Sequence, residues 1–368
     1  MRDRLAEELL ARVMEWEPQE VAAERALLQT LGDYKYDEYQ QFAPGMRFLE
    51  SLAYWLDQFT PGERRHAYEF VKSRLVYCSV AEMNHLVAIA YPDCVRPLLL
   101  ARAGRELGVN PWHSGKIEKM AQFQALQRQT LFLGLSDGAR TDVFRRANGT
   151  LSHEQVRQSH ELADERVDKL LEKLRKGLAP ILRREPTEDE VRFRCIVLMD
   201  DFSASGLSYL RKEGSQYDGK IGTFLQKMFD ASSRITTLVK HNDLEIFVVL
   251  YMATESARQY LESHLKAACD GGDTKTHVVV VHLLPEEAKV PRGQDPTLDA
   301  IIDAHYDSDN ETDSTRLGGT DLKYGFAWCG LPLVISHNTP NNSIGLLWAE
   351  GSVMRPLFPR VARHRDRV

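Results

Sequence analysis

The chain has 368 residues, of which 43% are hydrophobic and 27% are charged, and its formal net charge is −6. This length can bury a substantial core as one large domain or two ordinary ones, and the composition is typical of a soluble globular protein. No apolar stretch is long enough to cross a bilayer, the charged start is no signal peptide and the acidic balance gives no direct nucleic-acid signal. We therefore expect a cytoplasmic protein with no membrane partner.

The first part of the chain is predicted to be helical. Leu5, Leu9 and Val13 follow helical spacing, and further on Thr60 and Glu63 frame a capping box with a proline at the first helical position. We therefore predict a helical N-terminal region over residues 1–125.

The character of the sequence changes at residue 130. Residues 130–135 form a short apolar run followed by the polar residues 136–140, which indicates a strand that ends in a loop. Ser152 and Gln155 form a second capping box, and we predict a helix from there towards Lys176.

Alternating strand and helix patterns follow a polar linker. Three apolar runs are predicted strands (195–199, 245–251 and 276–284), and the segments between them have helical patterning (220–230 and 255–268). Such alternation predicts a parallel sheet in an α/β fold. We assign residues 126–368 to this α/β domain, with a further candidate strand at 331–335.

An acidic segment at residues 303–315 is rich in possible oxygen ligands. It lacks the glycine and terminal glutamate of an EF-hand at their fixed positions, so we predict an acidic surface loop.

The segment with the clearest chemistry is 195–208, which reads Cys-Ile-Val-Leu-Met-Asp-Asp-Phe-Ser-Ala-Ser-Gly-Leu-Ser. A buried strand here ends in Asp200 and Asp201, whose carboxylates suit sugar hydroxyls or a hydrated metal. The following loop of small hydroxylic residues contains Gly206, which lets the backbone close around an anion. The pattern favours a sugar-phosphate site.

This segment resembles the loop with which type I phosphoribosyltransferases bind phosphoribosyl pyrophosphate (PRPP), with serine at both expected threonine positions. The resemblance implies a parallel-sheet phosphoribosyltransferase-like core. It also implies that Asp200 and Asp201 hold the ribose hydroxyls and contact Mg²⁺ only through the ligand or water. The 5′-phosphate would lie against the loop residues Ser203, Ala204, Ser205, Gly206, Leu207 and Ser208.

The family has an earlier strand whose loop contacts pyrophosphate, and residues 130–141 are a plausible counterpart. The ligand-binding residues there would be Ser136, Asp137, Gly138 and Ala139. Gly138 permits close approach, and Arg140 offers positive charge as a catalytic residue on the leaving group.

The sequence departs from the family between these loops. Typical members carry a flexible basic hairpin there, whereas residues 142–191 read as charged helices. Arg145, Arg146, Lys212 or Lys220 substitutes for that hairpin, or the catalytic clamp is absent.

The core of the family also normally lacks such a long helical N-terminal region. The length of the chain, its serine-containing loop and the segment from 337–343 through 356–360 resemble the phosphoribosyltransferase-like proteins predicted in bacterial conflict (anti-phage) systems. The resemblance covers about residues 125–360. It implies a role in defence and a possible protein partner from a defence operon.

A second polar segment follows the apolar run 331–335. Asn338, Asn341 and Asn342 are candidate ligand-binding residues because asparagine suits recognition of a base or amide edge, and open α/β sheets bind ligands beyond their strands. The alternative is a turn cluster whose side chains satisfy their own backbone.

Two adjacent acids after a buried strand, such as Asp200 and Asp201, also occur in other kinds of site. The chain has no GxxxxGK[ST] motif, which disfavours a P-loop, and a phosphatase would need an Asp-x-Asp arrangement. A receiver-type acidic site and a purely structural Asp-Asp turn stay open.

Three functions remain. The first is a phosphoribosyltransferase that binds a PRPP-like molecule with Mg²⁺ and passes through an oxocarbenium-like state, with charge stabilisation as the main task of the site. The second is a catalytically inactive nucleotide-sensing module that acts through a partner. A glycosidase-like hydrolase that uses water as acceptor is the third.

Overall fold

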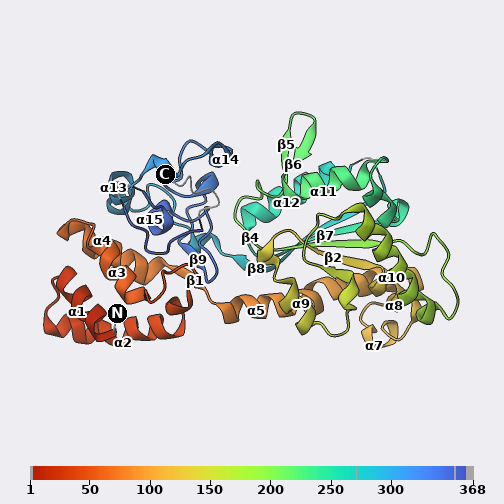
Figure 1. The fold of residues 1–368 in the computed structure, drawn as a ribbon, viewed down its shortest axis with the longest axis horizontal. Helices are drawn as coiled ribbons and strands as arrows, with labels where there is room; N and C mark the ends of the chain where they lie inside the picture. Colours follow the sequence, from red (N-terminus) through yellow and green to blue (C-terminus); the bar gives the residue numbers. More distant parts are fainter. Residues whose placement is uncertain (1–2, 271, 352–353, 362–368) are drawn as a thin grey trace. The chain divides into compact units, whose positions relative to one another are not determined.

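The structure is a computed structural model, and it describes residues 3–270, 272–351 and 354–361. The chain divides into two compact units (Figure 1). Unit 1 joins Met1–Glu82 with Pro285–Val368, and unit 2 is Met83–Leu284. The predicted division at residue 125 is thus corrected, since that residue lies inside unit 2. The C-terminal part, which we assigned to the α/β domain, belongs with the N-terminal helices.

Unit 1 is mostly helical and contains a small parallel sheet. The capping box at Thr60 is confirmed: Glu63 accepts from the Thr60 amide at 2.9 Å, and Pro61 opens the helix. The helices are α1 (Asp3–Val13), α2 (Pro18–Tyr34), α3 (Phe48–Leu56), α4 (Pro61–Arg74), α13 (Pro296–Ala304), α14 (Asp313–Arg316) and α15 (Gly345–Trp348), and the strands are β1 (Val76–Cys78) and β9 (Leu333–Ile335).

The candidate strand at 331–335 exists as β9, but it pairs in parallel with β1 and not with the main sheet. An aromatic cluster lies beside this pair, with the Phe48 and Phe358 rings stacked at 5.9 Å and Tyr36 against Phe48 at 4.5 Å. This local core ties the end of the chain to its beginning, which explains why the two segments form one unit.

Unit 2 contains a five-stranded sheet in the order β3-β2-β4-β7-β8, with every pairing parallel. The α/β fold and the predicted strands are confirmed. The strands are β2 (Thr130–Gly134), β3 (Val156–Arg157), β4 (Cys195–Ser203), β7 (Glu245–Thr254) and β8 (Lys275–Leu284). The helices are α5 (Val80–Ile89, which begins in unit 1), α6 (Arg96–Leu107), α7 (Ser114–Ile117), α8 (Ala121–Arg128), α9 (Thr141–Ala147), α10 (Asp164–Leu182), α11 (Gly219–Phe229) and α12 (Glu255–Ala268).

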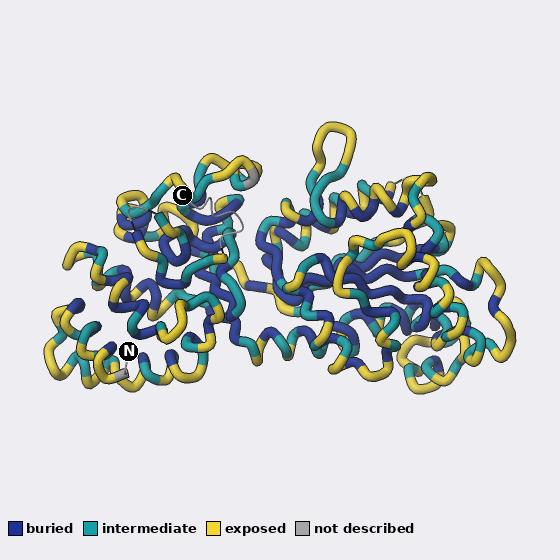
Figure 2. Tube along the Cα trace, in the orientation of Figure 1, coloured by how far each residue is buried: buried dark blue, intermediate teal, exposed yellow. Residues whose placement is uncertain are grey.

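Helices cover both faces of this sheet. On one face Leu198 of β4 belongs to a core with Leu174 of α10 and Leu261 of α12, and all three are fully buried. On the other face the Phe132 ring contacts Tyr91 at 5.8 Å and Phe144 of α9 at 5.3 Å. The central strands are consequently buried along their length, as Figure 2 shows, and this explains why they read as continuous apolar runs.

The helix predicted from Ser152 towards Lys176 is corrected. The capping box at Ser152 is present, but it caps a single short turn, His153–Gln155. Side-chain Nε2 of Gln155 then donates to the Thr130 carbonyl at 2.8 Å, and the next residue, Val156, pairs with Phe132 as the start of β3. The chain is therefore drawn into the sheet before α10 begins.

Two further segments complete the description. An antiparallel hairpin of β5 (Arg211–Glu213) and β6 (Gln216–Asp218) projects from unit 2 (Figure 1). The acidic segment 303–315 contains the end of α13, a short turn at Ser308–Asn310 and α14. Among the described residues, no helix is both long and apolar enough to span a membrane.

Candidate functional site

The order of the strands points to one edge of the sheet. Of the five strands in this sheet, β2 comes first in the chain. The next strand, β3, pairs on one side of β2, and the third strand, β4, pairs on its other side. The chain therefore reverses its winding direction between β2 and β4, and ligands of open parallel sheets bind beyond the carboxyl ends of strands at such a point. The loops that leave β2 and β4 are the two loops singled out in the sequence.

These loops start side by side. The Leu135 amide donates to the Met199 carbonyl at 2.9 Å, which continues the ladder between β2 and β4. Ser136 then donates through its hydroxyl to the carboxylate of Asp200. The two loops thus form a single polar site.

Asp200 lies at the centre of this site and has no exposed surface. Besides Ser136, its carboxylate accepts from Lys220 Nζ at 2.8 Å. Burial raises the pKa of the Asp200 carboxyl and the neighbouring Asp201 raises it further, against the opposing effect of Lys220 and Ser136. Lys220 is held over the Tyr209 ring, 5.0 Å from its centre.

Asp201 differs from Asp200 because it is partly exposed. Its Oδ1 accepts from the Phe202 amide at 2.8 Å. A Cβ on Gly138 would lie 2.5 Å from the Asp201 carboxyl carbon, so the loop after β2 passes against this carboxylate without room for a side chain. The space beside Gly138 is therefore occupied by the Asp201 side chain, whereas the predicted close approach of pyrophosphate to Gly138 stays a prediction.

The loop after β4 is folded tightly on itself. Ser203 Oγ accepts from the Gly206 amide at 3.1 Å, and Ser205 Oγ accepts from the Leu207 amide at 3.4 Å. Gly206 has φ +79°, in the left-handed region, and a Cβ there would lie 2.6 Å from the Tyr260 ring. The glycine is needed for the turn.

A buried threonine fixes this loop from the next strand. Thr254 ends β7 and is fully buried; its hydroxyl donates to the Ala204 carbonyl at 2.6 Å and accepts from the Ala257 amide at 3.1 Å, capping α12. The resemblance places the 5′-phosphate against this loop. The backbone amides of Gly206 and Leu207 already donate to serine side chains of the loop itself, whereas the Ser208 side chain is exposed.

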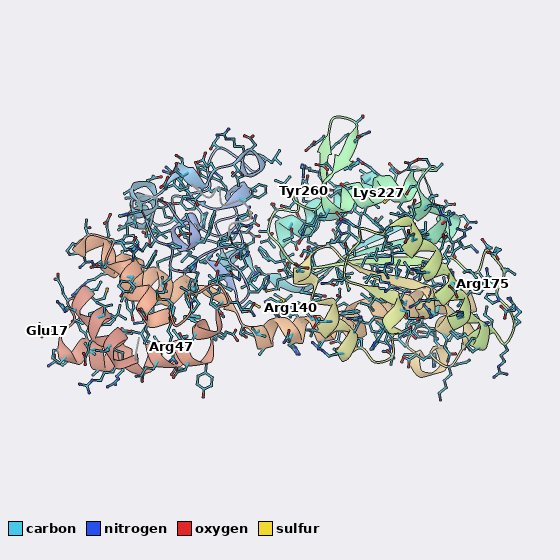
Figure 3. All side chains as sticks on the ribbon, in the orientation of Figure 1. Glu17, Arg47, Arg140, Arg175, Lys227 and Tyr260 are labelled. Atoms are coloured by element: carbon cyan, nitrogen blue, oxygen red, sulfur yellow. The ribbon has the colours of Figure 1, made fainter. Side chains whose placement is uncertain are left out.

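The loop after β2 is a short helical turn, Asp137–Ala139. Ser136 Oγ accepts from the Gly138 amide at 3.1 Å, and the buried Tyr251 hydroxyl donates to the Ala139 carbonyl at 2.6 Å. Arg140, which is labelled in Figure 3, follows with φ +43°. Its guanidinium donates to Asn84 Oδ1 at 3.3 Å. A non-glycine residue in this strained conformation at a loop end is common at functional sites.

The sequence missed the groups that hold the site together. It named Lys220 as a possible substitute for the basic hairpin, but not as the partner of Asp200. It did not single out Thr254, although a polar residue at the end of the apolar run 245–251 was a usable signal, because parallel strands end at the same edge.

Asn338, Asn341 and Asn342 lie in unit 1, after β9, so the prediction that they follow a strand of the five-stranded sheet is corrected. Asn338 Oδ1 accepts from the Val361 amide at 3.2 Å, and Asn342 Nδ2 donates to the Phe326 carbonyl at 3.1 Å. These partners lie 23 and 16 residues away in the sequence, so the two side chains hold other segments of unit 1 and do not satisfy their own backbone as a turn cluster would.

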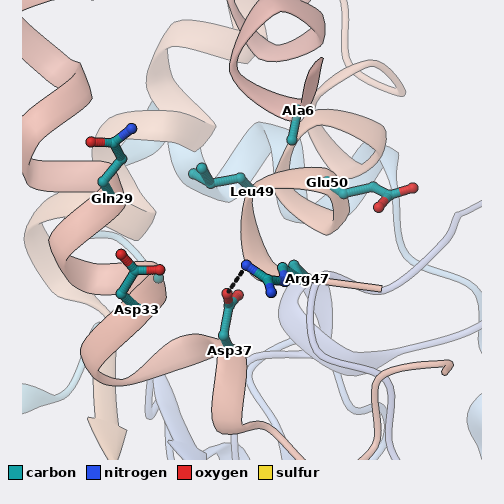
Figure 4. Close-up of a pocket in the computed structure, with 8 residues that line it drawn as sticks. Ala6, Gln29, Asp33, Asp37, Arg47, Leu49 and Glu50 are labelled. Atoms are coloured by element: carbon teal, nitrogen blue, oxygen red, sulfur yellow. Dashed lines mark ion pairs between the residues drawn. The ribbon is translucent and has the colours of Figure 1, made fainter. Parts of the chain in front are cut away.

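Unit 1 also contains a small hollow beside the ion pair of Arg47 and Asp37, whose closest atoms are 3.8 Å apart (Figure 4). Its volume is about 40 Å³, room for a few waters at most and not for a sugar phosphate. In the described part of the chain, no cluster of three or more His, Cys, Asp or Glu side chains could hold a metal ion. The loops after β2 and β4 remain the candidate, because the sequence pattern and the strand order both point to them.

A family model described as PRTase-CE matches residues 52–360. The chain belongs to the PRTase-CE family. The match covers most of both units, so unit 1 is part of what defines the family and is not an unrelated addition. It agrees with the resemblance drawn from residues 196–208 and makes this a phosphoribosyltransferase-like protein. No curated protein and no solved structure matches the chain.

Proposed function

We propose that the protein binds PRPP, or a related ribose-phosphate nucleotide, beyond the carboxyl ends of β2 and β4 and transfers the phosphoribosyl group to an acceptor. The observation that carries this proposal is the union of the two loops, in which Ser136 bonds Asp200 and Gly138 lies against Asp201. Sugar and pyrophosphate are neighbours in PRPP, and so are the loops expected to hold them.

In this proposal the two aspartates have different roles. Asp201, partly exposed, holds the ribose hydroxyls. Asp200 is enclosed by Ser136 and Lys220, so it contacts the sugar only if one of these groups moves aside. We therefore assign Asp200 the task of positioning Ser136 and Lys220.

The leaving pyrophosphate needs positive charge. Arg140 follows the first loop and Lys220 reaches the site from α11, so both can offset negative charge that develops as the glycosidic bond breaks. Mg²⁺ bound to the ligand's phosphates would neutralise part of that charge. Because a cluster of metal ligands is lacking among the described residues, Asp201 would contact such an ion through the ligand or water.

Thermal unfolding with and without PRPP and Mg²⁺ tests binding. We expect PRPP to raise the melting temperature of the wild type, and Asp201→Asn to abolish this rise while changing the melting temperature of the free protein little. Asp142→Asn, an exposed aspartate paired with Arg146 on α9, is the control and keeps the response. An unchanged PRPP response in Asp201→Asn contradicts the proposal.

A second candidate is a catalytically inactive sensor that binds the nucleotide and acts through a partner. The observation that favours it is the interval between the two loops, which contains α9, a short turn, β3 and α10 where typical members have a basic hairpin. Pyrophosphate release from PRPP with a panel of bases supports the transferase, and stabilisation without turnover supports the sensor. Release without any acceptor supports the hydrolase.

We further propose that this activity serves bacterial anti-phage defence with a protein partner from the same operon. The support is the resemblance to conflict-system proteins. Phage plating on cells that express the chain with its neighbouring genes tests it, with Asp201→Asn as the inactive comparison. Equal plating on both strains contradicts the defence role.

A further inference from the structure

Unit 2 contains a hollow of its own, and arginines line it. Its volume is about 360 Å³, within the range of small-molecule sites, and Arg145, Arg157 and Arg166 line it. Each arginine comes from a different element: Arg145 from α9, Arg157 from the end of β3 and Arg166 from the first turn of α10. Three elements of the segment 145–166 therefore bring their positive charges to one cavity.

These three charges are poorly compensated. Within the described residues, none of the three guanidinium groups makes a hydrogen bond or an ion pair, although Glu161 lines the same hollow. Burial lowers the pKa of Arg157, and the nearby Arg166 and Arg145 lower it further, while Glu154 acts in the opposite direction. Glu154 itself is shared with two other cations, Lys173 at 3.1 Å and Arg128 at 3.5 Å.

Like charges held together cost free energy, which an anion would recover. Guanidinium groups match phosphate oxygens through paired N–H donors, so a phosphate group is the anion that suits three arginines best. Thr141, Gln158 and Ser159 add neutral hydrogen-bonding groups to the wall. The hollow has the size and the chemistry of a site for a diphosphate.

The hollow is distinct from the loop at 203–208, and no residue of that loop lines it. It opens at the end of β3, two strands away from β4, which corresponds to about 10 Å at the usual strand spacing. The chain after β3 is fixed against β2, because the His160 amide donates to the Gly134 carbonyl at 2.9 Å. The two sites thus lie along the same edge of one sheet.

We propose that this arginine hollow binds the phosphate groups of a second small phosphorylated molecule, separate from the ribose phosphate held at residues 200–208. The claim deepens the proposed function, since a transferase needs an acceptor and this site would select a phosphorylated one. The binding itself does not depend on PRPP recognition and is tested separately.

Isothermal titration calorimetry of the full chain with inorganic pyrophosphate tests the site. We expect Arg145→Gln combined with Arg157→Gln to weaken pyrophosphate binding at least ten-fold. Lys176→Gln is the control, because Lys176 is exposed on α10, the helix that carries Arg166, and pairs with Glu172 at 2.5 Å; it should change binding less than two-fold. Asp201→Asn should also leave pyrophosphate affinity within three-fold of the wild type.

Folding is checked on the same variants. Since Arg157 is repelled by its neighbours, the free Arg157→Gln protein should melt no lower than the wild type. If it does melt lower, Arg166→Gln, at an exposed position, replaces it in the titration.

The proposal is overturned if the wild type does not bind pyrophosphate at millimolar concentration, or if the double arginine variant binds it as tightly as the wild type. It is also overturned if Asp201→Asn alone abolishes pyrophosphate binding. A parallel titration with PRPP separates the sources of phosphate. If the arginine variants lose PRPP as well, the hollow serves the same ligand and the claim of a second molecule is wrong. If the wild type binds pyrophosphate in the hollow but does not bind PRPP, the proposed function fails and this inference stands.

Discussion

Two polar segments of this protein follow apolar strands, and the structure treats them differently. Residues 200–208 leave a central strand of a five-stranded parallel sheet, whereas residues 337–343 leave β9, which pairs with β1 alone among the described strands. In the first segment a buried aspartate is held by Ser136 and Lys220 from two other elements. In the second, asparagine side chains bond to nearby backbone.

The difference shows that polar residues after a strand form a site only if neighbouring strands end beside them. β2, β4 and β7 end together, so Ser136, Asp201 and Thr254 meet at one edge. The sheet of β1 and β9 gives residues 337–343 no such neighbouring strand ends among the described strands, and the side chains of Asn338 and Asn342 bond to the backbone of Val361 and Phe326.

The largest expected effects come from Gly206, which lies in the first segment, and from Gly325, which packs against Asn342 of the second. Gly206 has φ +79° and Gly325 has φ +78°, and a Cβ on Gly325 would lie 2.2 Å from the Asn342 carbonyl oxygen. Gly325→Ala should lower the free energy of unfolding by about 4 kcal/mol, because backbone strain and a backbone clash add. Gly206→Ala should cost less, since Tyr260 can shift, but should remove the PRPP response. Urea unfolding and ligand-dependent melting measure both, and a lost PRPP response in Gly325→Ala would break the comparison.

Lys220→Met probes the buried carboxylate. We expect a loss of about 3 kcal/mol at pH 8, because Asp200 keeps its charge without a cation. The pKa of Asp200 in the folded protein is raised, so the folded state holds the proton more tightly. The free energy of unfolding therefore falls as pH rises from the ordinary aspartate value through the raised one.

The loss in Lys220→Met should accordingly shrink at pH 5, where a larger fraction of Asp200 is protonated. Urea unfolding at pH 5 and pH 8 measures this difference. Lys227→Met, an exposed position on the same helix, is the control. A loss that does not depend on pH would mean that Lys220 acts through packing alone.

Thr254→Val removes the support of the phosphate loop from β7. Its hydroxyl makes two buried hydrogen bonds, so the expected loss is about 2 kcal/mol together with a weaker PRPP response. Thr254→Ser keeps the hydroxyl and should retain the response. If both variants respond to PRPP as the wild type does, the threonine does not position the loop.

Asn342→Ala gives the smallest effect. Loss of its bond to the Phe326 carbonyl should cost about 1 kcal/mol, and the PRPP response should not change. Melting curves with and without PRPP test both statements, and a lost response would return Asn342 to the ligand site.

Much of the fold of unit 2 was predictable from the sequence. The central strands are buried on both faces, so residues 195–199 and 245–251 read as unbroken apolar runs. The helix expected from Ser152 was wrong because a capping box marks the start of a helical turn but not its length. The division at residue 125 was wrong because the return of the C-terminal segment to the N-terminal helices depends on contacts between distant residues.

The sequence by itself determined the local parts of the site: an apolar strand, two acids at its end and glycines where the backbone turns or approaches another group. These are properties of consecutive residues, set by burial pattern and steric freedom. The tertiary structure alone decided which side chains surround Asp200, which glycine lies against Asp201 and that residues 337–343 follow a strand of a different sheet. Strand order brings those groups together, and strand order depends on packing between segments far apart in the chain.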